Sequence, residues 1–559
     1  MIRFGFVTFG LLLFALPLLG GMVGVLLPAF GYFPPLGYEG ISLLPAALFW
    51  AHPHALTALF QSLYIGLTAT ALSVVFVFLC LALEQEHRAV HHIMKLVRVM
   101  LGPLIALPHS TIAIALLFLL APSGWLARLI SPEITGWMRP PAFGFVPDQS
   151  GGVLILGLMA KEIPFLLFVA LAQSQSLPVK RLLTLGRLHG YHGVASWLYL
   201  IWPQLYPLLR LPLFAVLAYA LSVIDMTLIL GPTLPPPLAG LILQGFTDPD
   251  LAARLPASFA AFLQLILIIA GMMIWVGVAK LCRLCSILLR HHQWRMRSIS
   301  LVTLPPLMIL GLSFVLLALG LIAIGLWAFA KSWPFSANLP QSYGLHLWRD
   351  SAEWGLLFAQ SFVIAVAASL SSIGLSMLWL EGRHWHRRSL SVMTLLLFIP
   401  LLVPQISLLF GLQVALSYLY LDGKLLTVIW LHTLYCLPYS WLVLAPALVH
   451  FDRRYITLAR SLGSGPWRCF WRVKLPMIAP SLASAFSIGI AVSVALYLPT
   501  LFAGAGRIDT VTTEAVTAAA NGARGGAARA ALMQMALPLL GFLAVSFFLR
   551  WQQAPKKQA

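Results

Sequence analysis

The sequence predicts an all-α membrane protein with about twelve transmembrane helices, arranged as two parallel repeats of six. Apolar residues make up 60% of the 559-residue chain and charged residues only 9%, whereas a soluble protein has roughly 25% charged residues. The apolar residues fall into runs long enough to cross a bilayer. One basic segment between two such runs also occurs twice, 273 positions apart. A repeat of this length indicates an architectural duplication.

A transmembrane helix needs about 20 predominantly apolar residues. This rule gives six candidate spans in each half of the chain: 5–28, 55–82, 101–121, 151–171, 206–229, 257–279, then 304–329, 354–380, 392–419, 425–449, 479–502 and 529–549. The first is interpreted as an uncleaved span, because its apolar run is longer than a signal-peptide core. We therefore expect a first transmembrane domain at 1–280, a basic cytoplasmic linker at 281–303 and a second transmembrane domain at 304–559.

The basic residues indicate how the spans are oriented. Most of them lie in six segments, which fall on one side of the membrane if both termini are cytoplasmic: 84–98, 172–192, 280–297, 381–388, 451–474 and the tail after Arg550. This is the distribution that the positive-inside rule predicts. The formal charge of +19 therefore does not indicate nucleic-acid binding. Because six is an even number of spans, both halves insert the same way up, as a parallel repeat.

The repeated segment runs from Thr184 to Pro207 and again from Thr457 to Pro480. We expect each copy to form a short helix, a turn at a glycine, a second helix and a proline at the start of a span. Shifting the first copy by 273 positions superposes identical residues at five places: Leu185 on Leu458, Arg187 on Arg460, Gly190 on Gly463, Pro203 on Pro476 and Pro207 on Pro480.

This segment resembles the cytoplasmic "EAA" loop of binding-protein-dependent ABC transporter permeases, the MetI-like type I importer fold. The family pattern is Glu-Ala-Ala, three residues, Gly, nine residues, then Ile-x-Leu-Pro. The second copy keeps Ala459, Gly463 and Pro476, and the first keeps Gly190 and Pro203. Both copies replace the glutamate with threonine, and the first has Leu185 and Gly186 in place of the alanine pair.

The resemblance implies a permease with both transmembrane domains fused in one chain, in the bacterial inner membrane. Its expected partners are two copies of a cytoplasmic ABC ATPase, a periplasmic solute-binding protein, a small-molecule substrate and membrane lipid. In the family the two loops transmit ATPase closure to the spans. Carried over, that role falls on the following residues: Thr184, Leu185, Gly186, Arg187, Gly190, Pro203, Thr457, Leu458, Ala459, Arg460, Gly463 and Pro476.

No phosphate-binding Gly-x-x-x-x-Gly-Lys-Ser/Thr motif occurs in the sequence. ATP hydrolysis is therefore expected on a separate subunit, and the chain is not expected to be an enzyme. No cofactor or metal is expected either. The lone Cys282-x-x-Cys285 pair has no second pair to complete a four-ligand zinc site.

The translocation path is expected to involve the polar residues inside spans. Ionisable groups there are costly and usually face the bundle interior or water. The ionisable candidates, each of which could equally have a structural role, are Lys161, Glu162, Asp225 and His432. The aromatic candidates are Tyr435 and Tyr497, for which ordinary packing is favoured over a role in the path. The fused layout also resembles permeases of thiamine and iron(III) importers, which implies a small polar solute of the thiamine-like or iron(III) kind.

Two alternatives belong to other classes of protein. An ion-gradient-driven secondary transporter with parallel repeats would have paired buried acids and no need for two equivalent cytoplasmic loops. A membrane-embedded enzyme could use His432 and Cys436, which lie one helical turn apart, but no third orienting group is evident.

Overall fold

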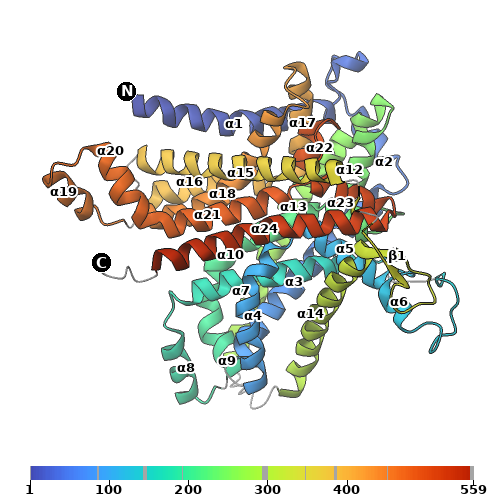
Figure 1. Cartoon of the computed structure of the whole chain (residues 1–559), viewed down its shortest axis with the longest axis horizontal. Helices are drawn as coiled ribbons and strands as arrows, with labels where there is room; N and C mark the ends of the chain where they lie inside the picture. The colour runs from blue at the N-terminus through green and yellow to red at the C-terminus, as the bar shows by residue number, and fades with distance from the viewer. Residues whose placement is uncertain are drawn as a thin grey trace.

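The computed structural model consists almost entirely of helices packed side by side (Figure 1). It describes residues 2–84, 87–142, 146, 148–191, 193–291, 300–345, 348–349, 351–382, 387–449 and 451–553. Within these ranges the only paired strands are β1 (Ala330–Ser332) and β2 (Ser342–Tyr343). The predicted all-α membrane fold is confirmed.

The helices of the first half are α1 (Ile2–Ala29), α2 (Leu44–Trp50), α3 (Ala55–Leu83), α4 (Arg88–Ala106), α5 (His109–Leu120), α6 (Trp125–Leu129), α7 (Gly152–Ser174), α8 (Val179–Leu188), α9 (Gly193–Ser196), α10 (Trp202–Ser222), α11 (Asp225–Leu230), α12 (Leu238–Thr247) and α13 (Arg254–His291). Short 3-10 turns form at Pro34–Leu36 and Leu251–Ala253.

The helices of the second half are α14 (Ser300–Phe329), α15 (Ser351–Gly382), α16 (Arg387–Leu402), α17 (Gln405–Tyr418), α18 (Leu425–Val449), α19 (Arg454–Ser461), α20 (Pro466–Cys469), α21 (Leu475–Ala495), α22 (Leu498–Gly504), α23 (Val511–Ala520) and α24 (Arg524–Gln553). From α7 onward the repeat is visible in the helix bounds themselves. Shifting α10 and α12 by 273 positions reproduces the bounds of α21 and α23.

The number of spans in the described residues comes close to the twelve predicted from the sequence. Ten helices in the described residues are long and apolar enough to cross a membrane, and the bent pair α16–α17 brings the count to eleven. Helix α1, whose apolar part includes Phe14–Ala29, lies at the position of the remaining predicted span.

Four spans predicted as continuous are instead broken in two. The breaks separate α4 from α5, α10 from α11, α16 from α17 and α21 from α22. Pro108 explains the break between α4 and α5, and Pro404 explains the break between α16 and α17. Each proline lies just before the second helix of its pair, has an extended backbone, and has no amide hydrogen to donate to a carbonyl of the preceding turn. The second break, at Val223, has no proline at the break itself, which is why the apolar pattern alone did not predict it.

The first span of each half packs against the other half. Helix α1 lies along α17, and α14 lies along α5 (Figure 1). Both contacts are close because small residues meet there: a Cβ on Gly24 would collide with Gly411, and one on Gly320 would collide with Ala115. Ala115 and Gly411 each occupy the seventh position of their helices, so the two crossings are equivalent.

The halves are also tied together at the end of the molecule that carries α6 and β1, away from α19 and both termini (Figure 1). The Arg128 guanidinium of the first half donates to the carbonyl of Trp333 at 3.0 Å, while Arg524 of the second half donates to the carbonyl of Ser123 at 3.0 Å. Both guanidinium groups lie over the Trp327 ring, at 5.3 and 4.9 Å. Part of the 122–152 connection is thus used in a contact between the two halves.

Candidate functional site

Both repeated basic loops fold in the same way. Each of the helices α8 and α19 is followed by a turn at a glycine. The turn after α8 lies at Gly190, where φ is +76°, and the turn after α19 lies at Gly463, where φ is +80°. In the first loop the Tyr191 amide donates to Gly186 at 2.9 Å; in the second the Ser464 amide donates to Ala459 at 3.0 Å. This hydrogen-bonded C-cap needs a left-handed residue, which glycine adopts without strain. The turns predicted at the two glycines are confirmed.

The segment after each glycine also matches its counterpart. A five-residue π-helical turn follows at Trp197–Ile201 and again at Phe470–Lys474. Pro203 and Pro476 then follow as the second residues of α10 and α21. In each half one helix of 30 residues runs from the loop into the membrane span, at Gly193–Ser222 and at Pro466–Ala495.

The replacement of an alanine by Gly186 in the first loop has a steric explanation. Gly186 is buried, and a Cβ there would collide with the Ser196 hydroxyl of α9. Ala459 occupies the same position in the second loop. The first copy therefore departs from the alanine pattern at a place where its two short helices pack more closely.

The outward faces of the two loops combine apolar and basic side chains. Leu188 is 77% exposed in the first loop and Leu462 is 78% exposed in the second. Leu185 and Leu458 are also exposed, and Arg187 and Arg460 lie in the last turns of α8 and α19. The hydroxyls of Thr184 and Thr457 donate to Lys180 and Arg453 in their own helices. Exposed leucines flanked by arginine are suited to a protein partner.

The second loop has two features that the first lacks. Lys474 forms an ion pair with Glu381 at the end of α15, and this fixes the base of the loop to a neighbouring span. Trp467 and Trp471 are exposed and their rings contact each other, whereas Val194 and Leu198 occupy the equivalent positions of the first loop. The two loops therefore have the same backbone conformation, but the side chains on their surfaces differ.

The structure places the candidate path residues in three different settings. The Lys161 ammonium donates to the carbonyls of Ile105 at 2.6 Å and Leu107 at 2.5 Å, at the break between α4 and α5. The Glu162 carboxylate accepts from Ser73 of α3 at 3.2 Å. The adjacent lysine and glutamate thus point to different neighbours, as the 100° helical spacing predicted.

Asp225 and Tyr497 lie at the two equivalent breaks, at the start of α11 and just before α22. The Tyr219 hydroxyl donates to Asp225 at 3.0 Å. Asp225 is therefore held by a tyrosine of its own half. Tyr435 is fully buried.

His432 is held entirely by hydroxyl groups of its own half. Its Nδ1 lies 2.8 Å from the Ser493 hydroxyl and its Nε2 lies 3.0 Å from the Thr500 hydroxyl. The Cys436 thiol instead donates to the Gly489 carbonyl at 3.4 Å. This geometry gives the histidine a role in joining α18 to α21 and α22, and it offers the thiol no base.

Replacing Cys436 by alanine is therefore expected to leave transport within about twofold of the unmodified protein, because a buried thiol behaves as a small apolar group. Uptake by membrane vesicles, normalised to the amount of permease, measures this. Loss of transport with unchanged protein level would instead support a nucleophilic role for Cys436.

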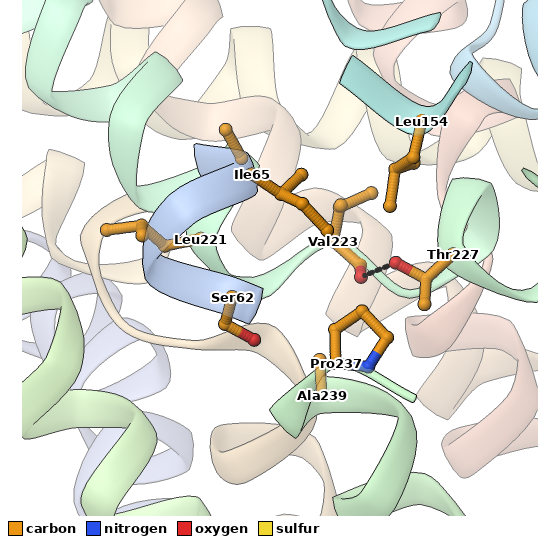
Figure 2. Close-up of a pocket in the computed structure, with 9 residues that line it drawn as sticks. Ser62, Ile65, Leu154, Leu221, Val223, Thr227, Pro237 and Ala239 are labelled. Carbon is orange, nitrogen blue, oxygen red and sulfur yellow. Dashed lines mark hydrogen bonds between the residues drawn. The ribbon is translucent and has the colours of Figure 1, made fainter. Parts of the chain in front are cut away.

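A small cavity lies beside the break between α10 and α11 (Figure 2). Ser62 and Ile65 of α3 line it together with Val223 and Thr227, and the Thr227 hydroxyl donates to the Val223 carbonyl at 2.7 Å. Its volume of about 10 Å³ is near the minimum for one water molecule. It is therefore a packing defect at the break and not a substrate chamber.

Sequence reasoning missed several polar residues at the contact between the halves. Gln534 of α24 is fully buried, and it joins Thr111 of α5 at 2.6 Å to Thr512 of α23 at 2.9 Å. The ring of His109 packs on that of Tyr219, with 4.4 Å between centroids. The rule that selected Asp225, a polar residue inside a span, would also have selected His109 and Gln534.

Two halves with repeated helices, each with a basic loop that continues into a span, are typical of a transport protein of the membrane. The family described as "Binding-protein-dependent transport system inner membrane component" matches residues 372–556. The "Inner membrane ABC transporter permease protein YnjC" of Escherichia coli K12 is 30% identical over 455 residues, which is 80% of either chain. The chain therefore belongs to the ABC transporter permease family.

Shorter matches come from two other relatives. The "Putative 2-aminoethylphosphonate transport system permease protein PhnV" of Salmonella typhimurium is 27% identical over 146 residues, 25% of this chain and 54% of that protein. The "Spermidine/putrescine transport system permease protein PotC homolog" of Mycoplasma pneumoniae is 25% identical over 182 residues, 31% of this chain and 63% of that protein.

Proposed function

We propose that this chain carries both transmembrane domains of an ATP-driven importer, at residues 1–280 and 304–559, with 281–303 as a cytoplasmic linker. The observation that carries the proposal is the pair of equivalent loops around Gly190 and Gly463. Each presents exposed leucine and arginine on a short helix, which is a recurring way of occupying a groove on a partner protein.

Two equivalent loops imply two equivalent partners. We therefore assign one copy of a cytoplasmic ABC ATPase to α8 and one to α19. Each loop continues without interruption into a span through a π-helical turn, so movement of the loop is transmitted to the bundle. ATP-driven closure would then rock the halves between inward-open and outward-open states.

Because the ATPase is cytoplasmic, the positions of α8 and α19 also assign the two sides of the membrane. Both termini are cytoplasmic, because they lie toward the end of the bundle that carries α19 (Figure 1). The opposite end, which includes α6 and the β1–β2 hairpin, faces the periplasm. It exposes Ile134, Met138, Tyr343 and Leu345, which form a surface for a solute-binding protein. The substrate is a small polar solute, and we keep both a thiamine-like solute and iron(III) as candidates.

Purifying the tagged chain from its native membrane tests the proposal. We expect a P-loop ATPase to copurify at two copies per chain, and the complex to hydrolyse ATP. Native mass spectrometry gives the stoichiometry. A chain that emerges alone after gentle extraction would favour the ion-gradient-driven transporter and would reduce α8 and α19 to lipid contacts.

A further inference from the structure

Helix α10 carries an exposed arginine inside a membrane span. Arg210 lies within the apolar helix Gly193–Ser222, and its side chain is on the outside of the bundle. It forms no ion pair within the residues that the structure describes. Neither α10 nor α13, which packs against it, contains an acidic residue. A charged side chain inside a span is costly without a counter-charge, and on these two helices that counter-charge has to come from the surroundings.

The Arg210 guanidinium is positioned by aromatic side chains of both helices. It lies over the Tyr206 ring, 5.6 Å from the centroid. The Trp275 indole of α13 donates to the Tyr206 hydroxyl oxygen at 3.1 Å, and the Trp202 ring lies 6.3 Å from the Tyr206 ring between centroids. Because the Tyr206 hydroxyl accepts from Trp275, its own hydrogen is left to donate to another acceptor. A cation and a hydroxyl donor are thus held side by side.

The depth of this group matches the headgroup region of a bilayer. The sequence predicts that the span begins at residue 206, and Arg210 is one helical turn further in, about 6 Å along the axis. Arginine side chains near the end of a span extend back toward the headgroups, where tryptophan and tyrosine are also concentrated. The position of the guanidinium over the Tyr206 ring is in that direction. In the proposed orientation this is the cytoplasmic side of the membrane.

The surface around the arginine is apolar and faces outward. Leu208 of α10 is 41% exposed, and Met273 and Ile274 of α13 are 64% and 42% exposed. Phospholipid acyl chains can cover such a surface while the headgroup reaches the polar atoms. The second half has no equivalent, because a shift of 273 places Ala479 and Ala483 at the positions of Tyr206 and Arg210. The feature is therefore not part of the repeated transport machinery.

We propose that Arg210 and Tyr206 form a binding site for an anionic phospholipid, with Trp275 as a positioning residue. The guanidinium and the tyrosine hydroxyl donate to the phosphodiester oxygens, as charge-assisted hydrogen bonds of arginine commonly do. Lys280, the next cation along α13, is exposed and adds positive charge near the cytoplasmic end of that helix. With two cations and no acid on these helices, a headgroup of net negative charge is favoured over a zwitterionic one. The site does not depend on the importer proposal.

Native mass spectrometry of the purified full chain in detergent tests the site. The probes are phosphatidylglycerol and phosphatidylcholine with identical acyl chains, each titrated separately, and phosphatidylglycerol titrated again with excess inorganic phosphate. We expect the first phosphatidylglycerol to bind about tenfold more tightly than phosphatidylcholine, and free phosphate not to displace it. Arg210→Gln should remove this preference, because loss of a charge-assisted hydrogen bond lowers affinity by about tenfold or more.

Further variants separate the parts of the site. Tyr206→Phe removes only the hydroxyl and should weaken phosphatidylglycerol binding by less than Arg210→Gln does. Arg210→Lys keeps the charge but loses the planar group that stacks on the ring, so its affinity should be intermediate. Arg181→Gln is the matched control, since it removes one exposed cation from α8, outside the spans, and should leave the preference unchanged.

A thermal unfolding series distinguishes binding from folding. A ligand that binds only the folded chain raises its transition temperature, so phosphatidylglycerol should stabilise the unmodified chain and the Arg181→Gln variant more than Arg210→Gln. Without added lipid, Arg210→Gln and the unmodified chain should unfold at the same temperature. If Arg210→Gln proves less stable, Tyr206→Phe and Arg210→Lys decide the question, and unchanged lipid preference in both overturns the site.

Other results would also contradict the proposal. Equal binding of the two phospholipids would show that Arg210 only extends toward the headgroups without selecting among them. Displacement of phosphatidylglycerol by inorganic phosphate would identify a site for the free anion and not for a lipid. The importer proposal is tested separately in the same preparation, because copurification of the ATPase and its ATP hydrolysis do not require Arg210.

Discussion

Replacing Gly463 by aspartate is expected to lower transport by roughly 100-fold, the upper range of a typical coupling free energy, while the chain stays in the membrane. Gly463 adopts a φ of +80°, and its amide donates to Arg460 at 2.9 Å to close the end of α19. Nothing lies within 4 Å of a Cβ built there. The variant therefore folds, but it strains the turn and places a negative charge on a basic face. ATP-dependent uptake, with permease quantified in the membrane fraction, measures the effect.

Gly465→Asp is the control that separates charge from conformation. It adds the same charge two residues later, also with no atom within 4 Å of the new Cβ. However, Gly465 has a φ of −65° and is the N-cap of α20, a position where aspartate is favourable. We expect a much smaller loss of transport from this variant. Normal uptake by Gly463→Asp would contradict the coupling role of the second loop.

Replacing Lys161 by methionine is expected to destabilise the first half by about 2–4 kcal/mol. The Lys161 ammonium is bonded to the carbonyls of Ile105 and Leu107 at the break before Pro108. The last carbonyls of a helix have no partner within it, and each buried polar group left unpaired costs about 1–3 kcal/mol. Thermal unfolding of the purified chain in a mild detergent measures the change as a lower transition temperature.

Leu434→Met is the comparison variant, because Leu434 occupies the position equivalent to Lys161 in the second half. Such a swap conserves volume and usually costs less than about 1.5 kcal/mol. Lys161→Arg retains several donors and should recover part of the stability. Equal transition temperatures for Lys161→Met and the unmodified chain would show that the ammonium does not stabilise the break.

The features that sequence reasoning predicted are those determined by residues close together along the chain. Gly190 and Gly463 predicted the two turns, because a left-handed C-cap depends on a few neighbouring residues. Pro203 and Pro476 were expected to begin the following spans, but the helix runs through both of them, from Gly193 to Ser222 and from Pro466 to Ala495. Because the basic segment occurs twice, 273 positions apart, each local prediction made for one half also applied to the other half.

The features that could not be predicted depend on contacts between distant segments. The break at Val223 carries no proline, so the sequence near it gives no signal for a helix end. Tyr219 resembles any other aromatic residue of a span until the fold packs the ring of His109 against it, with 4.4 Å between the centroids. The role of Lys161 was likewise hidden, because its partners are backbone carbonyls of a helix more than fifty residues earlier.

The crossing of α1 onto the second half also sets an order for assembly during synthesis. Gly24 cannot meet Gly411 until almost 400 further residues have been made, which takes roughly 20–80 s at about 5–20 residues per second. During that interval the α1 face that will contact α17 must be covered by lipid or by an insertion factor. Small residues on that face then let α17 approach α1 closely when it is made. Fusing both halves in one chain makes sure that the partner helix follows from the same ribosome.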